Sequence, residues 1–135
     1  MTITLQHDLA GVDWSELARL YQATLGPDEP QQLERTWLRS YATILAYDGA
    51  RMVGAARAIS DGEREALIVG VAVLPEYQRR GIGTLMMRDL VERLDGAAIV
   101  LTCSEDASVP FYRGLGFRTH KRVMVLHYPD DTLID

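Results

Sequence analysis

The stretch "VAVLPEYQRRGIGTLMM", residues 71–87, decides the fold class. It begins as an apolar strand, passes a proline, and places Arg79 and Arg80 directly before the helix start Gly81-Ile82-Gly83. The first amides of a helix have no partner within the helix, and the peptide dipoles add partial positive charge there. Glycines keep side chains away from a bound anion, and the two arginines add full charges. The stretch therefore predicts an anion site, and a pyrophosphate is its natural ligand.

Two other interpretations of this strand-to-helix turn stay open on the residues alone. A glycine-containing helix start is also an ordinary packing device, and the two arginines could simply be solvated. The common nucleotide signatures do not decide the matter. A dinucleotide fingerprint requires a third glycine where Met86 stands, and a Walker loop requires Gly-Lys-Ser/Thr after four spacer residues.

The totals of the chain predict a soluble globular protein with a single domain, residues 1–135. Of its 135 residues, 47% are hydrophobic and 24% charged, which suits one packed core. The net charge of -5 argues against a nucleic-acid partner, because phosphate binding draws on broad basic surfaces. The N-terminus has no signal-like pattern and no run of about 18 apolar residues occurs. We therefore predict a cytoplasmic protein without a membrane partner.

Cysteine and histidine usage predicts no metal site. Cys103 is the single cysteine, which excludes an internal disulfide and a thiolate cluster. Within "IVLTC" it is expected to pack as a small apolar group. The histidines His7, His120 and His127 form no pair with metal-ligand spacing and a carboxylate.

Working outward from residues 71–87, hydrophobic periodicity and turn residues predict the other elements. Asp13 is the expected N-cap of the first helix, with Glu16 at the capping-box position. Asp48-Gly49 marks a hairpin turn. The expected order is a strand at 3–6, helices at 14–26 and after 30, hairpin strands within 43–60, a strand at 66–74, a helix after 83, a strand at 97–103, a short helix at 106–116 and one or two strands within 117–128. This order predicts a mixed α/β or α+β sheet protein.

Two motifs together resemble a known family. Gln78-Arg79-Arg80-Gly81-Ile82-Gly83 and the stretch "FYRGLGF", residues 111–117, are similar to signatures of the GNAT superfamily of acetyl-CoA-dependent N-acetyltransferases. The stretch around the first motif also looks like small bacterial members and plant arylalkylamine acetyltransferases of the serotonin type. The resemblance implies a central, mixed and twisted sheet of six to seven strands, flanked by about four helices, with splayed central strands.

The resemblance also implies a site for acetyl-CoA. The strand Val71, Ala72 and Val73 would part from residues 100–102 and pair with the pantetheine arm through its backbone. The amides of Arg79, Arg80, Gly81, Ile82, Gly83 and Thr84 would hold the pyrophosphate, and Thr84 could add its hydroxyl. Glu105 stands where the family often has an Asn. Ser104 or Ser108 could make that contact instead, although each could equally cap a helix or be solvated.

For the chemistry, Tyr112 matches the family's usual general acid, which protonates the CoA sulfur. Packing like that of Phe111 is the alternative. The amide of Val73 or a neighbour is the expected oxyanion donor.

The general base is less defined, because Gly70 stands where plant-like relatives commonly carry an Asp. Glu65 and Asp61 are the candidates, with Glu63 and His120 behind them. Asp61 lies in "SDG", where it could only close a turn, and Glu65 could be an edge residue. Water could also take the proton.

The predicted function is acetyl transfer from acetyl-CoA to a primary amine, most simply a small molecule. A CoA-binding sensor without efficient turnover is one alternative, and acetylation of protein or peptide amines is another. Four aromatic residues of the early helices, Trp14, Tyr21, Trp37 and Tyr41, could line an acceptor site for an aromatic or polyamine-like amine, or could simply pack in the core. Homodimerisation is left open, since the final strands offer edges that could pair.

Overall fold

The structure is a computed structural model of the chain, and it describes residues 1–128. Five strands form one sheet in the order β1-β2-β3-β4-β5, so neighbours in sequence are neighbours in space. The first four are antiparallel, and β5 runs parallel to β4. The strands are β1 (Ile3–Gln6), β2 (Ala42–Asp48), β3 (Arg51–Ser60), β4 (Glu65–Val73) and β5 (Ala98–Leu101).

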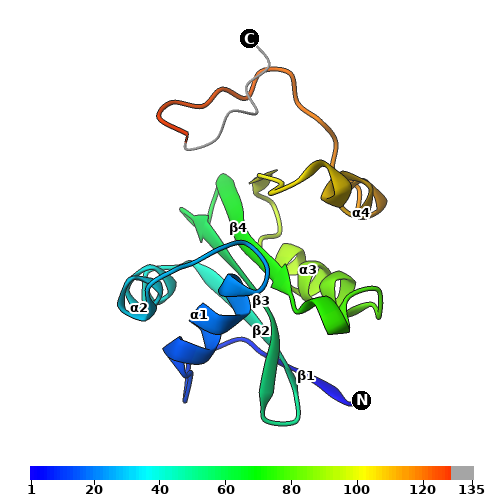
Figure 1. Ribbon diagram of the computed structural model, residues 1–135. Helices are drawn as coiled ribbons and strands as arrows, with labels where there is room; N and C mark the ends of the chain where they lie inside the picture. The colour runs from blue at the N-terminus through cyan, green and yellow to red at the C-terminus, as the bar shows by residue number, and fades with distance from the viewer. Residues whose placement is uncertain (129–135) are drawn as a thin grey trace.

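Helices cover both faces of this sheet. The helices α1 (Trp14–Gln22) and α2 (Pro30–Leu38) lie on one side, and α3 (Ile82–Glu92) lies on the other (Figure 1). The short helix α4 (Val109–Gly114) follows β5, and single 3-10 turns occupy Pro75–Tyr77 and Asp106–Ser108. None of the helices in the described part of the chain is long and apolar enough to cross a membrane.

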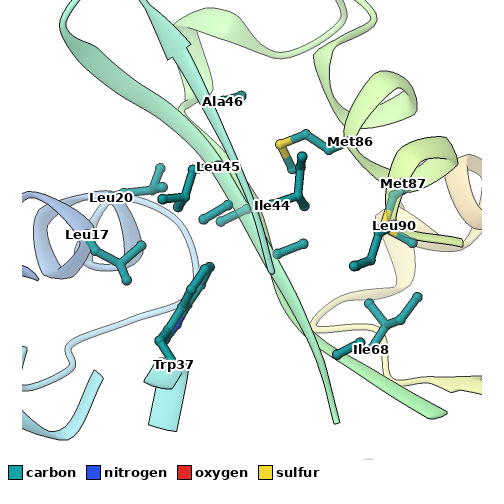
Figure 2. Close-up of a cluster of buried hydrophobic side chains, with 14 of the residues drawn as sticks. Leu17, Leu20, Trp37, Ile44, Leu45, Ala46, Ile68, Met86, Met87 and Leu90 are labelled. Atoms are coloured by element: carbon teal, nitrogen blue, oxygen red, sulfur yellow. The ribbon is translucent and has the colours of Figure 1, made fainter. Parts of the chain in front are cut away.

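The core is divided between the two faces, because successive side chains of a strand point to opposite sides. Figure 2 shows Leu45 of β2 toward Leu20 of α1, while the adjacent Ile44 points toward Met86 of α3. All four side chains are almost completely buried. The run of apolar residues in β2 therefore reflects a strand that is covered on both faces.

The first helix is held at its N-terminus as expected, but not by a capping box. Asp13 Oδ1 accepts from the amides of Ser15 and Glu16 at 2.9 and 3.3 Å. Glu16 does not reach back to the cap. Its Oε2 accepts instead from the amide of Met52 on β3 at 3.0 Å, which ties α1 to the sheet.

The expected strands within residues 117–128 do not form, so the described sheet has five strands instead of six or seven. A turn at residues 121–122 interrupts the alternating pattern, and Arg122 N donates to His120 Nδ1 there at 3.0 Å. The following apolar side chains, Val123, Met124, Val125 and Leu126, are exposed. The segment lies beyond the end of the sheet, in orange and red in Figure 1. Alternating apolar and polar residues allow a segment to bury one of its faces. A strand forms, however, only where a neighbouring strand pairs with its backbone hydrogen-bonding groups.

Candidate active site

The site begins where β4 and β5 part. The two strands are paired from Glu65 with Ala98 to Ile68 with Leu101, and the pairing ends there. Strand β4 continues to Val73. Its last residues therefore present backbone groups on the β5 side without a strand beside them. The predicted splay of the central strands is confirmed.

A bulge at Gly70 and Val71 bends β4 at this point. Arg57 on β3 pairs with Val69, and the next pair is Ala55 with Ala72, so two residues of β4 oppose one residue of β3. Gly70 has a φ of +66°, a conformation that glycine adopts without strain. At this bulge the carbonyl oxygen of Gly70 lies beside α1.

Tyr21 of α1 fills the space beside this bulge. Its hydroxyl donates to the carbonyl oxygen of Gly70 at 2.7 Å. A Cβ atom at position 70 would lie only 2.6 Å from that hydroxyl oxygen. Burial raises the pKa of Tyr21, so its phenol remains a neutral donor. Sequence reasoning treated Tyr21 only as one of four aromatics, although an isolated glycine inside a strand is itself a signal for a bulge or a close neighbour.

The largest cavity of the site has a volume of about 460 Å³ and lies between the end of β4, the start of α3 and α4. We call it the α3 groove. Eight residues that were predicted from the sequence line it: Val71, Val73, Arg79, Gly81, Gly83, Thr84, Ser108 and Tyr112. Glu105 also lines it.

Four residues of the predicted cofactor site do not line this groove, namely Ala72, Arg80, Ile82 and Ser104. Ala72 and Ile82 are buried in the core. Arg80 turns outward, with its guanidinium carbon 5.4 Å from the centre of the Tyr77 ring and Nη1 3.6 Å from the sulfur of Met1. The two arginines of the motif are therefore not equivalent, since only Arg79 lines the groove.

The two glycines of the motif have different roles. Gly81 has a φ of +83°, and a Cβ atom added there would meet nothing within 4 Å, so it is the backbone conformation that requires a glycine. At Gly83 a Cβ atom would lie 3.1 Å from Cζ of Phe111. Gly83 therefore allows α4 to pack closely on the start of α3.

The start of α3 offers the donors that an anion requires. The first helical hydrogen bond runs from Leu85 N to Gly81 O at 3.1 Å, so the amides of Ile82, Gly83 and Thr84 have no partner within the helix. No side chain within residues 1–128 caps this end. The exposed guanidinium of Arg79 adds charge beside these amides. This set of donors fits a diphosphate group.

Tyr112 lies at the junction of two cavities. It lines the α3 groove and also a cavity of about 320 Å³, which we call the central cavity, and Val71 lines both as well. The Tyr112 ring packs edge-on against Phe111 and Phe117, with centroids 5.0 and 6.0 Å away. Burial, with a smaller contribution from Cys103, raises the pKa of Tyr112 to about 12. No hydrogen bond between residues 1–128 involves its hydroxyl, which is thus a neutral donor free to act on a ligand.

The residues after β5 line the central cavity. Cys103 is exposed and lines it, so the expectation that this cysteine packs as a small apolar group is wrong. The reason is that β5 ends at Leu101, and the chain has left the sheet before it reaches Cys103. Ser104 lines the central cavity rather than the α3 groove.

A third cavity, of about 280 Å³, adjoins the central cavity. It lies between α1, α2 and β3, and we call it the α1–α2 cavity. Leu25 and Gly70 line both this cavity and the central cavity. Tyr21, Trp37 and Arg57 form part of its wall. Each of the three cavities therefore shares lining residues with the next.

The structure does not bring the candidate bases to Tyr112. Asp61 Oδ1 accepts from the amides of Glu63, Arg64 and Glu65 at 2.8, 2.8 and 3.3 Å, which closes the turn before β4. These bonds lower the pKa of Asp61.

Glu65 lies six residues before Val71 on β4, which is about 20 Å at roughly 3.3 Å per residue. Neither carboxylate, nor Glu63 or His120, is among the described residues that line the three cavities. Within residues 1–128 no three His, Cys, Asp or Glu side chains gather closely enough to hold a metal ion.

The chain is an α/β domain with a parted sheet and a groove that runs from the start of α3 to the buried phenol of Tyr112. Residues 12–117 match the model of the Acetyltransferase (GNAT) family, and the chain belongs to that family. The resemblance of its two motifs is thereby confirmed.

Known proteins similar to this chain agree with the family. Glucosamine 6-phosphate N-acetyltransferase of Trypanosoma brucei brucei is 43% identical over 61 residues, which cover 44% of this chain and 42% of that protein. Chloroplastic serotonin N-acetyltransferase 2 of rice, Oryza sativa subsp. japonica, is 37% identical over 86 residues, which cover 62% of this chain and 42% of that protein. The chain thus spans less than half the length of these curated relatives.

Among solved structures, a GNAT-family acetyltransferase of Streptococcus pneumoniae has a TM-score of 0.78 and 29% sequence identity. The match covers 94% of this chain and 100% of the other. The arrangement of the sheet and helices is therefore shared over almost the whole chain.

Proposed function

We propose that the protein is an N-acetyltransferase that moves an acetyl group from acetyl-CoA to the primary amine of a small molecule. The observation that carries the proposal is the position of Tyr112, whose buried phenol lies where the α3 groove meets the central cavity. A thioester in the groove and an amine in the central cavity meet at this residue. The names of the two curated relatives support a small acceptor, since they specify serotonin and glucosamine 6-phosphate.

The α3 groove suits acetyl-CoA at two points. The amides of residues 82–84 and the Arg79 guanidinium would bind the pyrophosphate. The open edge of β4 at Val71 and Val73 would pair with the pantetheine arm, as an added strand would, once the arm replaces Gln78 Nε2, which donates to the Val73 carbonyl at 2.9 Å. The thioester then lies toward Tyr112, at the other end of the groove.

The chemical step requires an acid for the leaving sulfur. The amine nitrogen forms a bond to the thioester carbonyl carbon, and the carbon–sulfur bond then breaks. Tyr112 donates its phenolic proton to the sulfur and regains a proton from solvent. A backbone amide near Val73 donates to the carbonyl oxygen while it carries negative charge. The products are the N-acetylated amine and CoA.

No side chain is proposed as the base. Gly70 has none, and the Tyr21 hydroxyl already donates to the Gly70 carbonyl. Asp61 closes a turn, and Glu65 lies at the far end of β4. In this proposal the acceptor enters as the free amine, and its proton leaves to water in the central cavity.

The test is CoA release with a panel of primary amines, for the parent and for Tyr112→Phe. We expect turnover of at least one small amine, and a fall in kcat of about 100-fold or more in Tyr112→Phe with acetyl-CoA binding retained. Tyr41→Phe is the matched control, because Tyr41 is an exposed tyrosine outside the three cavities.

Two results would contradict the proposal. A parent that turns over no amine, yet is stabilised against heating by acetyl-CoA, would be a CoA-binding sensor. Turnover of peptide amines without small amines would point to a protein substrate.

A further inference from the structure

Arg57 of β3 has fewer hydrogen-bond partners than Arg93, the other partly buried arginine of the described chain. Arg93 donates to the Asp89 carboxylate at 3.0 Å and to the Thr43 carbonyl at 2.6 Å. Arg57 is also partly buried, but within residues 1–128 its one side-chain hydrogen bond runs from Nη1 to Ser40 Oγ at 3.3 Å. No carboxylate of that part of the chain lies within 4.0 Å of it.

The charged guanidinium of Arg57 is partly removed from water, which costs free energy. Burial lowers the pKa of Arg57, yet an arginine remains charged in a protein. A partly desolvated charge is normally balanced by a carboxylate or by several hydrogen bonds, and one long bond to a hydroxyl supplies little of that. Within residues 1–128 the remaining N–H groups of the fork have no hydrogen-bond partner, and they can therefore bind an anion.

The location of Arg57 connects it to the proposed chemistry. It forms part of the wall of the α1–α2 cavity, which shares Gly70 and Leu25 with the central cavity. Its pairing partner Val69 lies two residues before Val71, or about 7 Å along the strand. An acceptor whose amine reaches Tyr112 could thus bring a second group to Arg57 if only a few bonds separate the two.

One carboxylate lines the same cavity. Asp28 is exposed, and its Oδ1 accepts from the amide of Glu29 at 2.9 Å. Solvent screens an exposed charge much more than a partly buried one. The less solvated charge of the cavity is therefore positive, although the whole chain carries a net charge of -5.

We propose that Arg57 selects acceptors that carry an anionic group, a carboxylate or a phosphate, a few bonds from the primary amine that is acetylated. The inference rests on the proposed acetyl transfer and names the class of its acceptor. Simple arylalkylamines and polyamines are poor substrates under this proposal, because they would fill the cavity and leave the Arg57 charge without water or a partner.

The test compares amines in matched pairs. β-Alanine against ethylamine, and phenylalanine against phenethylamine, differ by a carboxylate, and O-phosphoethanolamine against ethanolamine differs by a phosphate. For the parent we expect kcat/KM to be at least tenfold higher for the anionic member of one kind of pair, and the pairs distinguish carboxylate from phosphate. In Arg57→Gln this preference should vanish through a higher KM for the anionic amine, while the uncharged amine changes less than about twofold.

Two further variants separate recognition from folding. Arg57→Lys keeps the positive charge and should keep part of the preference. Arg35→Gln, at an exposed position of α2 outside the three cavities, should leave the preference unchanged. An equal loss of kcat/KM for both members of each pair in Arg57→Gln and Arg57→Lys would assign Arg57 a merely structural role and overturn the inference.

A binding measurement keeps this inference distinct from the proposed function. Calorimetric titration of the same amine pairs into the parent and Arg57→Gln requires no turnover. Tighter binding of the anionic amine to the parent alone, without CoA release, would refute the acetyl transfer and keep the Arg57 site. Turnover that shows no preference for anionic amines would keep the acetyl transfer and refute the Arg57 site.

Discussion

The Tyr21 hydroxyl donates to the carbonyl oxygen of Gly70 at 2.7 Å, and this bond joins α1 to the bulge of β4. Only a glycine fits beside Tyr21 here, because a Cβ at position 70 would lie 2.6 Å from the hydroxyl oxygen. The aspartate that the family resemblance would place here therefore has no room beside Tyr21. Gly70 lines both the central cavity and the α1–α2 cavity, and Tyr21 lines the α1–α2 cavity.

Introducing the missing acid should damage the protein instead of improving it. We expect Gly70→Asp to destabilise the fold by about 2 kcal/mol or more, because φ is +66° there and the new Cβ meets the Tyr21 hydroxyl. Denaturant unfolding measures this loss. The double variant Gly70→Asp with Tyr21→Phe should recover part of it, since the hydroxyl is gone. Full stability of Gly70→Asp alone would contradict the described bulge.

The two arginines of the helix start should respond differently to charge reversal. Arg79→Glu should weaken acetyl-CoA binding by about tenfold or more, because Arg79 lines the α3 groove. Arg80→Glu should have a clearly smaller effect, because Arg80 packs over the Tyr77 ring and does not itself line the groove. Calorimetric titration with acetyl-CoA measures both affinities. Equal effects would mean that the charge acts only at long range.

The pH–rate profile should lack an alkaline limb from the general acid. Burial raises the pKa of Tyr112 to about 12, so the phenol keeps its proton through pH 10. Turnover should rise with pH as the acceptor amine loses its proton, and then stay level to pH 10. Steady-state rates with an amine of known pKa test this. A fall in kcat near pH 9 that is absent in Tyr112→Phe would show that the phenol ionises earlier.

Asp61 should matter for stability at low pH and not for turnover. Three backbone amides lower its pKa below the ordinary value of 3.8, so its contribution is full above that value and is lost as pH falls through the lowered pKa. In Asp61→Asn the free energy of unfolding should depend less on pH in this acidic range, and kcat should be unchanged. A kcat loss comparable to that of Tyr112→Phe would restore Asp61 as a catalytic candidate.

Local sequence patterns predicted most elements of the fold. The Asp13 cap, the turn at Gly49 and the apolar run of β4 each specify structure through neighbours within a few residues. The motif at residues 78–83 was likewise readable, because its anion site consists of the amides of the motif itself. These features depend on backbone conformation and hydrophobic period, which the order of residues specifies directly.

The predictions that the structure contradicts share a different cause. Residues 117–128 predicted one or two strands, and Cys103 was expected to pack as a small apolar group, yet both outcomes depend on where β5 ends and what lies beside it. Glu16 was assigned to a capping box by its spacing, but a backbone amide of β3 competes for its carboxylate. In each case a partner remote in sequence changed the result.

The residues alone determined the family, the order of strands and helices up to α4, and the strand-to-helix turn with its free amides. Only the tertiary structure decided that Tyr21 takes the space beside Gly70, that Arg79 and not Arg80 lines the groove, and that Arg57 has no carboxylate beside it in the described chain. The physical reason is the separation in sequence between the residues that interact. Helix starts and turns depend on backbone geometry over a few residues, whereas a cavity and its charges depend on side chains that distant segments bring together.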